Sequence, residues 1–423
     1  MSEATRRLRL PAPLVAAAAS PQFASAVTVS AIATVMLGFA VRSTMGWAGY
    51  IAAVATLVVL QTAVLVGRRG RLEWRGLLPI SLLVFVGWCA ASILWSQYQW
   101  STVGGVALQL ALAFLAVGTA LTRDLIQVVR AFGDVFRAVL GLSLVVEVLS
   151  GVLLDTPFPF LGVQGRVGLG GPIQGVLGSR NMLGLVALLA AVTFAIEYAT
   201  RSVPRVVAAT SLVAAGAMVF LSRSPVTAGV LIVAGIATVG LLGLRRVRAE
   251  SRRYYQAGLL VLSLALAVVA YLGRNRLIES LNAGTEFETR YRLWHSVLNF
   301  IPLHPLEGFG WVGYWRRNLA PFFAIGSRST GESALNAFLD VWFQTGLIGL
   351  VAFLALVLLA LVRAWLTASN RRSVVHLWPA LVLVVLVATA AAESALLVEY
   401  SWFTLVVCTV KAAQELSWRR ALE

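Results

Sequence analysis

The run "NAFLDVWFQTGLIGLVAFLALVLLALV", Asn336 to Val362, contains 27 residues and a single charged side chain, Asp340. About 20 apolar residues in an α-helix are enough to cross the ~30 Å hydrocarbon core of a membrane. The run therefore predicts a transmembrane helix. Its acid lies about one turn from the start, and a charge at membrane depth is costly and usually functional.

Runs of the same kind recur along the whole chain. The protein has 423 residues, of which 59% are hydrophobic and 12% are charged, with a mean hydropathy of +0.85. Unbroken apolar runs are typical of helices and differ from the short alternating strands of a membrane β-barrel. We predict an all-α polytopic membrane protein that forms a single membrane domain over residues 1–423. About twelve transmembrane helices are expected, at 23–42, 46–67, 77–95, 104–121, 138–154, 181–199, 204–221, 226–244, 257–273, 336–362, 377–395 and 397–412.

The distribution of basic residues predicts the orientation. With the N-terminus inside, the cytoplasmic segments carry 23 of the 34 Lys and Arg residues, as basic loops usually do. Seven of the remaining 11 lie in one long loop, 274–335, and long loops escape this rule. We therefore expect both termini on the cytoplasmic side of the cytoplasmic membrane. The net charge of +16 is explained by this topology, and we expect no nucleic-acid partner.

Two segments on the outer side are too long to be simple turns. The first, 155–180, reads "DTPFPFLGVQGRVGLGGPIQGVLGSR", and its Gly and Pro residues exclude a long regular element. The second is the loop 274–335, which contains "EFETRYRLWHSVLNFI". Apolar residues recur there at helical spacing, which predicts an amphipathic helix that lies on the membrane surface or caps the bundle. They are Phe287, Tyr291, Trp294, Leu298 and Ile301.

Arginines gather in these outer segments. Arg223 lies in "FLSRSPVTAG" between two spans. Its guanidinium group either anchors the end of a helix at the membrane surface or donates paired hydrogen bonds to a phosphate or carboxylate. Arg166 and Arg180 bracket the glycine-rich loop, whose backbone could approach an anion closely. Arg290 and Arg292 are two residues apart on the expected helix and so point about 200° apart. We expect one of them to face the bundle and the other to face water.

Acids are expected at the same end. Asp340 lies about one turn into its span, and Glu393 and Glu399 flank the junction of the last two spans. They pair with the outer arginines, bind substrate hydroxyls or take a proton, and the sequence does not choose between these roles. The three His and two Cys residues lack the spacing of a metal site, so we predict no metal and no cofactor.

An outward-facing vestibule rich in arginine suits an amphiphile that carries phosphate on its headgroup. A lipid-linked diphosphate sugar has these properties, because its tail stays in the bilayer while arginines hold the diphosphate. The diphosphate leaving group also supplies the driving force. The chain contains no GxxxxGK[ST] motif that would indicate nucleotide as the energy source.

Five stretches together resemble the bacterial O-antigen ligase and polymerase superfamily, which are membrane glycosyltransferases of the GT-C type. The order, spacing and placement of these stretches relative to the spans carry the resemblance. They are "SILWSQYQWS" (92–101), "GVLGSRNMLG" (175–184), "FLSRSPVTAG" (220–229), "TRYRLWHSVLNFIPLHPLEGFGWVGYW" (289–315) and "ESALNAFLDVWFQTGLIGL" (332–350).

This resemblance implies a GT-C-like bundle and a metal-independent, inverting reaction. A glycan would pass from an undecaprenyl-diphosphate donor to a glycan or lipid acceptor on the outer face. The resemblance implies that Arg223 and Arg290 hold the diphosphate, with Arg290 identified by its four-residue offset from Trp294. Asn181 matches the loop-to-helix signature, although Thr289 replaces the family's glycine before the arginine. The sugar, the acceptor and the oligomeric state are not implied.

The main departure from the family lies at Leu335. The family has a histidine there, immediately before Asn336, and that histidine is expected to assist the attacking hydroxyl. A leucine cannot accept a proton, and general-base assistance is typically worth about 10²–10⁴-fold. Either the position was altered, or the chain binds glycolipid without turnover, or another group takes the role. Glu332, Asp340 and His295 are the nearest candidates.

Two further classes stay open. The peptidoglycan polymerases of cell shape and division have a similar mechanism, but their loop motifs are not found in this chain. A transporter or flippase for an anionic lipid-linked polymer also explains the spans and the basic vestibule. It predicts inverted repeats or helices broken at the midplane, and neither is visible in the sequence.

Overall fold

The computed structural model describes residues 18–71, 79–248, 250–273, 276, 284–316, 318–326 and 333–415. Helices occupy all twelve positions expected to cross the membrane: α2 (Pro21–Met36), α3 (Gly38–Gly67), α4 (Ile80–Ala91), α5 (Gln99–Thr122), α6 (Leu125–Val148), α7 (Arg180–Thr200), α8 (Arg205–Ser222), α9 (Pro225–Arg246), α10 (Arg252–Leu272), α14 (Ala337–Asn370), α15 (Leu377–Ala390) and α16 (Glu399–Glu415). Among the described residues, seven helices are long and apolar enough to span a membrane. The all-α polytopic membrane class is confirmed, and the count of twelve spans stays a prediction.

Two boundaries differ from the sequence prediction. The expected break at 43–45 is absent, because α2 ends at Met36 and α3 continues through this region. Helix α3 instead bends at Gly46, whose φ of 70° is readily available only to glycine. Helix α6 starts at Leu125 and not at 138, so a charged segment expected in a loop is helical. Its Arg137 is paired with Asp134 at 3.0 Å and with Glu197 of α7, which explains how the helix accommodates these charges.

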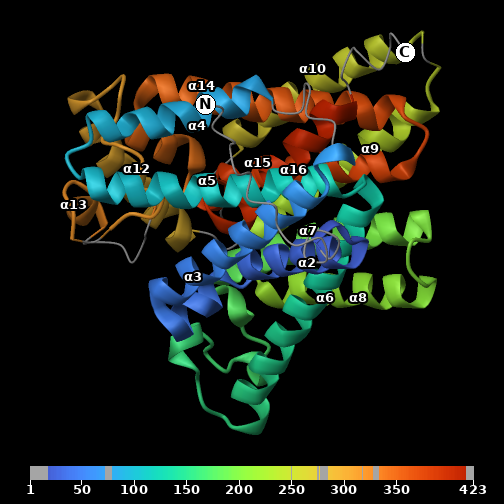
Figure 1. Cartoon of the computed structure of the whole chain (residues 1–423), viewed down its shortest axis with the longest axis horizontal. Helices are drawn as coiled ribbons and strands as arrows, with labels where there is room; N and C mark the ends of the chain where they lie inside the picture. The colour runs from blue at the N-terminus through green and yellow to red at the C-terminus, as the bar shows by residue number, and fades with distance from the viewer. Residues whose placement is uncertain are drawn as a thin grey trace, which may run out of the picture.

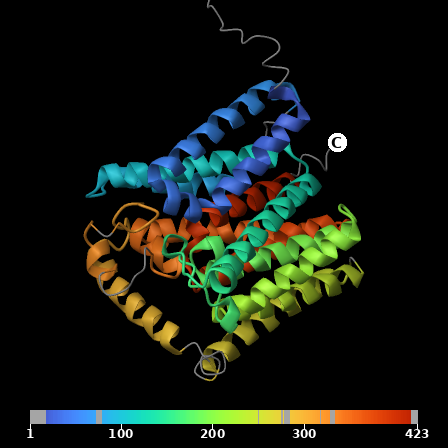
Figure 2. The same ribbon diagram turned by 90° about the horizontal axis from the view of Figure 1, so that it is seen from below.

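Helix α16 forms the centre of the bundle. Every residue from Ser401 to Val410 is buried, and α16 packs against α5, α14 and α15. Figure 2 shows this helix between the layer of α2–α5 and the layer of α7–α10, with α6 crossing from one to the other. Apolar residues cover most sides of this stretch, as expected of a helix with neighbours on all sides. The Trp402 indole donates to the Gln109 carbonyl oxygen at 3.1 Å, which fixes α16 against α5.

Helix α14 is broken at Gly346, and the loop after α12 fills the break. Gly346 has a φ of 69°. The amide of Leu347 donates to the Pro305 carbonyl at 2.9 Å, and that of Gly310 donates to the Gln344 carbonyl at 2.8 Å. The motif "PLEGFGWVG" is therefore a docking segment for the start of α14. A transporter would use such a break for its substrate, whereas here protein backbone occupies it.

The expected amphipathic helix is confirmed as α12 (Gly284–Phe300), which packs against α13 (Phe322–Gly326) and α14 and so caps one end of the bundle (Figure 1). Its buried face differs in part from the predicted one. Ile301, in the turn that follows α12, is buried as predicted, but within the helix Leu293 and Val297 are buried, whereas Tyr291 and Leu298 are exposed. Arg290 faces inward because it is ion-paired with Glu286 and Glu393. The side of α12 that carries Arg290 is therefore the buried side.

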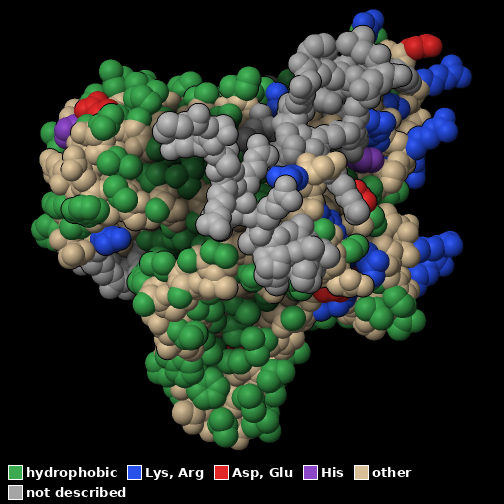
Figure 3. Space-filling view, in the orientation of Figure 1, with side chains coloured by type: hydrophobic (Ala, Val, Ile, Leu, Met, Phe, Trp, Pro, Cys, Tyr) green, Lys and Arg blue, Asp and Glu red, His purple; other side chains and the backbone are tan. Residues whose placement is uncertain are grey.

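Basic side chains collect at the end of the bundle opposite α12. Figure 3 shows Lys and Arg gathered at that end, on the right of the view. The exposed arginines of the turns there are Arg201, Arg205, Arg246, Arg248, Arg253, Arg371 and Arg372. All of them belong to segments that the charge distribution predicts to be cytoplasmic. The α12 end is thus the candidate outer end.

Candidate functional site

Four charged side chains from three parts of the chain form one network at the α12 end. Arg180, the first residue of α7, is ion-paired with Glu286. Arg290 donates to Glu286 Oε2 at 3.0 Å, to Glu393 Oε1 at 2.9 Å and to the Ala392 carbonyl oxygen at 3.2 Å. Only 9% of the Arg290 side chain is exposed. A guanidinium in such a place needs these partners, because an unpaired buried charge is strongly destabilising.

Asn181 extends this network to the start of α9. Its Nδ2 donates to Glu393 Oε1 at 2.6 Å, and its Oδ1 accepts from Ser224 Oγ at 2.7 Å. Ser224 is the N-cap of α9, and its Oγ accepts from the Thr227 amide at 3.1 Å. Burial raises the pKa of the Glu393 carboxyl, and Arg290 and Asn181 oppose that shift. The starts of α7 and α9 and the turn after α15 are therefore held together through one carboxylate.

Two further arginines border a turn beside the network. Arg223 precedes the cap of α9 and has a left-handed backbone with a φ of 44°. A methyl group added to Gly170 would lie 3.4 Å from Arg223 Nη2, and the Gly171 amide donates to the Arg166 carbonyl at 2.9 Å. Both arginines are exposed, and neither has an ion-pair partner within the described ranges. Their guanidinium groups are available to an anion.

The glycine-rich loop is anchored to the helices around it. Glu147 Oε1 of α6 accepts from the backbone amides of Gln174 and Gly175, each at 2.8 Å. The Ile173 amide donates to the Leu221 carbonyl of α8 at 3.2 Å. The buried Glu147 carboxylate therefore has a positioning role, and it holds the turn with Arg166 close to Arg223.

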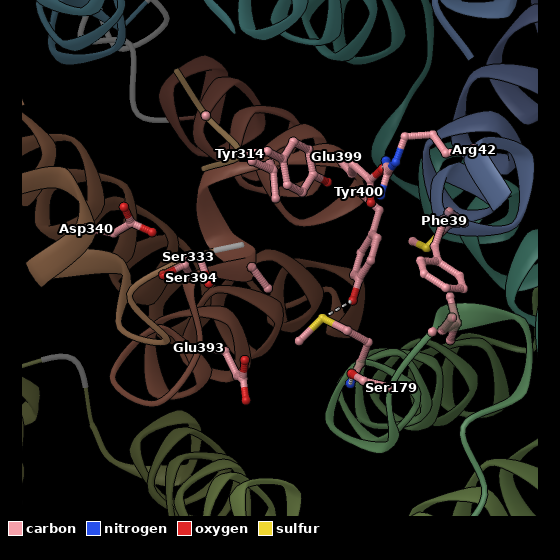
Figure 4. A pocket seen from close by; sticks show the side chains of 17 residues that line it. Phe39, Arg42, Ser179, Tyr314, Ser333, Asp340, Glu393, Ser394, Glu399 and Tyr400 are labelled. Atoms are coloured by element: carbon pink, nitrogen blue, oxygen red, sulfur yellow. Dashed lines mark hydrogen bonds and ion pairs between the residues drawn. The ribbon is translucent and has the colours of Figure 1, made fainter. Parts of the chain in front are cut away.

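A cavity of ≈ 380 Å³ lies next to the network (Figure 4). Arg42, Glu399 and Tyr314 lie on one side of it, and Glu393, Ser394 and Asp340 lie on the other. Its other walls come from α2, the start of α7, Gly313 and the segment from Ala395 to Tyr400; the polar residues there include Ser179 and Ser333. Glu393 belongs both to the network and to the wall of the cavity.

Asp340 is fully buried and held by donors from three segments. Its Oδ1 accepts from Trp315 Nε1 at 2.8 Å and from Gln344 Nε2 at 2.7 Å, and its Oδ2 accepts from the Ala334 amide at 3.2 Å. Such a set of hydrogen bonds fixes the carboxylate in place. Asp340 ties the start of α14 to the loops that precede it.

Asn336 forms the N-cap of α14. Its Oδ1 accepts from the amides of Phe338 and Leu339, each at 3.0 Å, and its Nδ2 donates to the Ala391 carbonyl at 3.0 Å. Through these contacts Asn336 stabilises the helix start and the adjacent turn. Loss of an N-cap of this kind costs about 1 kcal/mol.

Leu335 has a left-handed backbone with a φ of 51°. Its side chain packs against the apolar cluster beneath α12, which contains Leu293 and Val297. Trp294 Nε1 holds the same segment by donating to the Ala334 carbonyl at 3.0 Å. A left-handed backbone is uncommon for leucine and several-fold more frequent for histidine, asparagine and aspartate. The position therefore combines a left-handed backbone with an apolar side chain.

The structure brings most of the predicted site residues together. Arg180, Asn181, Arg290 and Glu393 form one network, and Arg223 lies one residue from it. Arg166 is near Arg223, and Asp340 lines the neighbouring cavity. As expected, Arg290 faces the bundle, whereas the Arg292 side chain is 71% exposed. His295 is exposed, and Glu332 lies outside the described residues.

Sequence reasoning missed Glu286 and Arg42. Glu286 is four residues before Arg290 on a predicted helix, and this spacing is a signal for an ion pair. Arg42 gave no such signal, because its partner Glu399 lies near the other end of the chain.

Comparison with known protein families supports the resemblance. Residues 210–354 match the family model described as O-antigen ligase. This segment runs from α8 to the middle of α14 and contains Arg223, Arg290, Trp294 and Asp340. None of the curated proteins matches the chain. Residues 210–354 are therefore similar to the O-antigen ligase family, which supports the resemblance to the O-antigen ligase and polymerase superfamily.

Proposed function

We propose that this membrane protein is a glycosyltransferase that moves a glycan from an undecaprenyl-diphosphate donor to a lipid or glycan acceptor. One observation carries the proposal. The segment that matches the O-antigen ligase family contains both Arg290, which belongs to the network at the end of the bundle with the cavity, and Arg223, which lies beside that network. The protein would lie in the cytoplasmic membrane with both termini inside and this end facing outward.

The contacts favour different roles for the arginines. Arg223 and Arg166 are exposed and unpaired within the described ranges, so they are suited to the first contact with the diphosphate. Arg290 and Arg180 already neutralise Glu286 and Glu393, so they would mainly position the site. The N-termini of α7 and α9 lie at the same place, and helix N-termini favour anions.

The proposed reaction is a direct displacement. A hydroxyl oxygen of the acceptor attacks the anomeric carbon of the donor sugar, and the bond from this carbon to the diphosphate oxygen breaks. The diphosphate leaves with the electron pair while the arginines stabilise its charge. Attack from the opposite side inverts the anomeric centre. We propose no cofactor, because the arginines can supply the required charge.

A deletion strain tests this function and separates its two forms. Full-length polymer that accumulates on the carrier lipid would identify a ligase, and a collapse of chain length would identify a polymerase. Complementation with Arg166→Ala/Arg223→Ala should restore less than about 1% of transfer, because charge-assisted contacts to the leaving group are lost. Arg292→Ala, a matched change of an exposed arginine, should restore it fully. Surface glycans that do not change on deletion would refute the proposal.

Leu335→His tests whether the wild-type site lacks a base. The variant should fold, since histidine tolerates the left-handed backbone better than leucine does. We expect transfer in membranes to change by less than about tenfold, because the cavity already contains carboxylates. A gain on the order of 10²-fold or more would instead show that the leucine leaves the site without its base.

A further inference from the structure

We propose that the cavity binds the acceptor sugar and that Glu399 takes the proton of the attacking hydroxyl. This inference rests on the proposed glycosyl transfer and assigns its acceptor side. The cavity is of a size typical of small-ligand sites, with apolar walls and a few polar groups. It shares Glu393 with the arginine network, so a sugar bound in it would lie next to a donor held by the arginines.

Glu399 is held at the cavity wall by unusual local geometry. It is the first residue of α16 and has a left-handed backbone with a φ of 47°. Its carboxylate is ion-paired with Arg42 of α3, and only 9% of its side chain is exposed. A methyl group on Gly38 would overlap the carboxylate, so α3 leaves room for it only because residue 38 is glycine. A strained residue with a dedicated space is a frequent feature of functional sites.

Aromatic rings surround the partner of Glu399. The Arg42 guanidinium carbon lies 4.7 Å from the ring centroid of Trp47, 5.5 Å from that of Tyr50 and 4.9 Å from that of Tyr314. Cation–π contacts of this kind fix the guanidinium. Tyr314 also lines the cavity. An aromatic ring beside a carboxylate and an arginine offers an apolar face for the C–H groups of a sugar and polar groups for its hydroxyls.

The other two acids that line the cavity already have several hydrogen-bond or ion-pair partners. Asp340 accepts hydrogen bonds from three donors, and Glu393 is held by Arg290 and Asn181. Glu399 faces Arg42 and lies on the same side of the cavity as Tyr314, whereas the Tyr400 hydroxyl is directed to Met182 Sδ at 3.2 Å. Among the described acids of the cavity wall, Glu399 therefore has the fewest fixed partners.

The proton transfer completes the displacement. As the acceptor oxygen bonds to the anomeric carbon, its proton passes to the Glu399 carboxylate. The bond to the diphosphate oxygen breaks at the same time, and the electron pair leaves with the diphosphate. Release of the proton to water then restores the carboxylate. Arg42 holds the carboxylate in place during these steps and acts as a positioning residue.

The test uses the deletion strain with plasmid-borne alleles, since its permeabilised membranes supply the native donor and acceptor. Glu399→Gln should lower the rate of glycan transfer by about 10²-fold or more, the usual value of a general base. The wild-type rate should fall as the pH is lowered and the carboxylate becomes protonated. The residual rate of the variant should not follow that decrease.

Matched variants separate catalysis from folding. Glu197→Gln removes a buried, arginine-paired acid at the far end of α7 and should keep the wild-type rate and pH profile. Arg42→Gln/Glu399→Gln removes both charges, avoids an unpaired arginine and should lose transfer while accumulating normally. Transfer by Glu399→Gln within threefold of wild type, or a reduced rate with the wild-type pH profile, would overturn the inference and leave the proposed function intact. Unaltered surface glycans in the deletion strain would refute both.

Discussion

Replacing Arg290 with alanine should lower the free energy of unfolding by about 3–5 kcal/mol and abolish glycan transfer. The change removes the cation that neutralises Glu286 and Glu393, and breaking a buried ion pair from one side typically has a cost of this size. Without Arg290, the turn after α15 also loses its contact with α12 at the Ala392 carbonyl. Thermal unfolding in detergent and transfer in membranes measure the two effects.

Arg292→Ala is the matched control on the same helix. Its side chain is 71% exposed and reaches Glu288 only at 3.9 Å, so stability should change by less than about 0.5 kcal/mol. Arg290→Ala/Glu393→Gln should be less destabilised than the two single changes together, because the uncompensated charge is removed. Strict additivity of the two changes, or a folded and fully active Arg290→Ala, would contradict the assigned coupling.

Gly346→Ala should prevent the loop after α12 from docking on α14 and lower the free energy of unfolding by about 4 kcal/mol. The φ of 69° disfavours any residue with a Cβ, at a cost of about 1–2 kcal/mol. The added methyl group would also overlap the Leu306 carbonyl, and overpacking typically adds about 1–3 kcal/mol. Transfer should fall with stability, because the same loop contains Trp315, a donor to Asp340.

Gly235→Ala provides the control for this change. Gly235 lies in the exposed part of α9, and an added methyl group would contact nothing within 4 Å. Alanine is favoured over glycine in a helix by about 1 kcal/mol, so this variant should be equally or more stable. Equal melting temperatures for Gly346→Ala and wild type would show that the break in α14 does not need glycine.

Much of the architecture is predictable because a membrane restricts the chain so strongly. Apolar length locates the helices, since an unpaired backbone in hydrocarbon is too costly. The helical spacing of "EFETRYRLWHSVLNFI" predicts α12, and the arginines of the two long segments predicted to be outside indicate the end of the bundle where the candidate site lies. The family resemblance rests on short motifs, and the structure explains one of them as the docking contact around Gly346.

The face of α12 was not predictable from its own sequence. Counting apolar side chains puts Tyr291 and Leu298 inside, but the structure buries Arg290 in their place. A prediction from hydrophobic spacing assumes that every arginine side chain is exposed to water. It takes no account of Glu393, which lies far along the chain. Only a partner carboxylate in space makes the burial of the guanidinium favourable.

The amino-acid sequence alone thus establishes the class of protein, the positions of its helices and the residues from which a site can be built. The pairing of those residues comes from the tertiary structure. Glu399 and Arg42 meet only because α16 lies at the centre of the bundle and Gly38 leaves space on α3. Helical periodicity is local, whereas the partner of a buried charge is fixed by which helices pack together, and that packing depends on the whole chain.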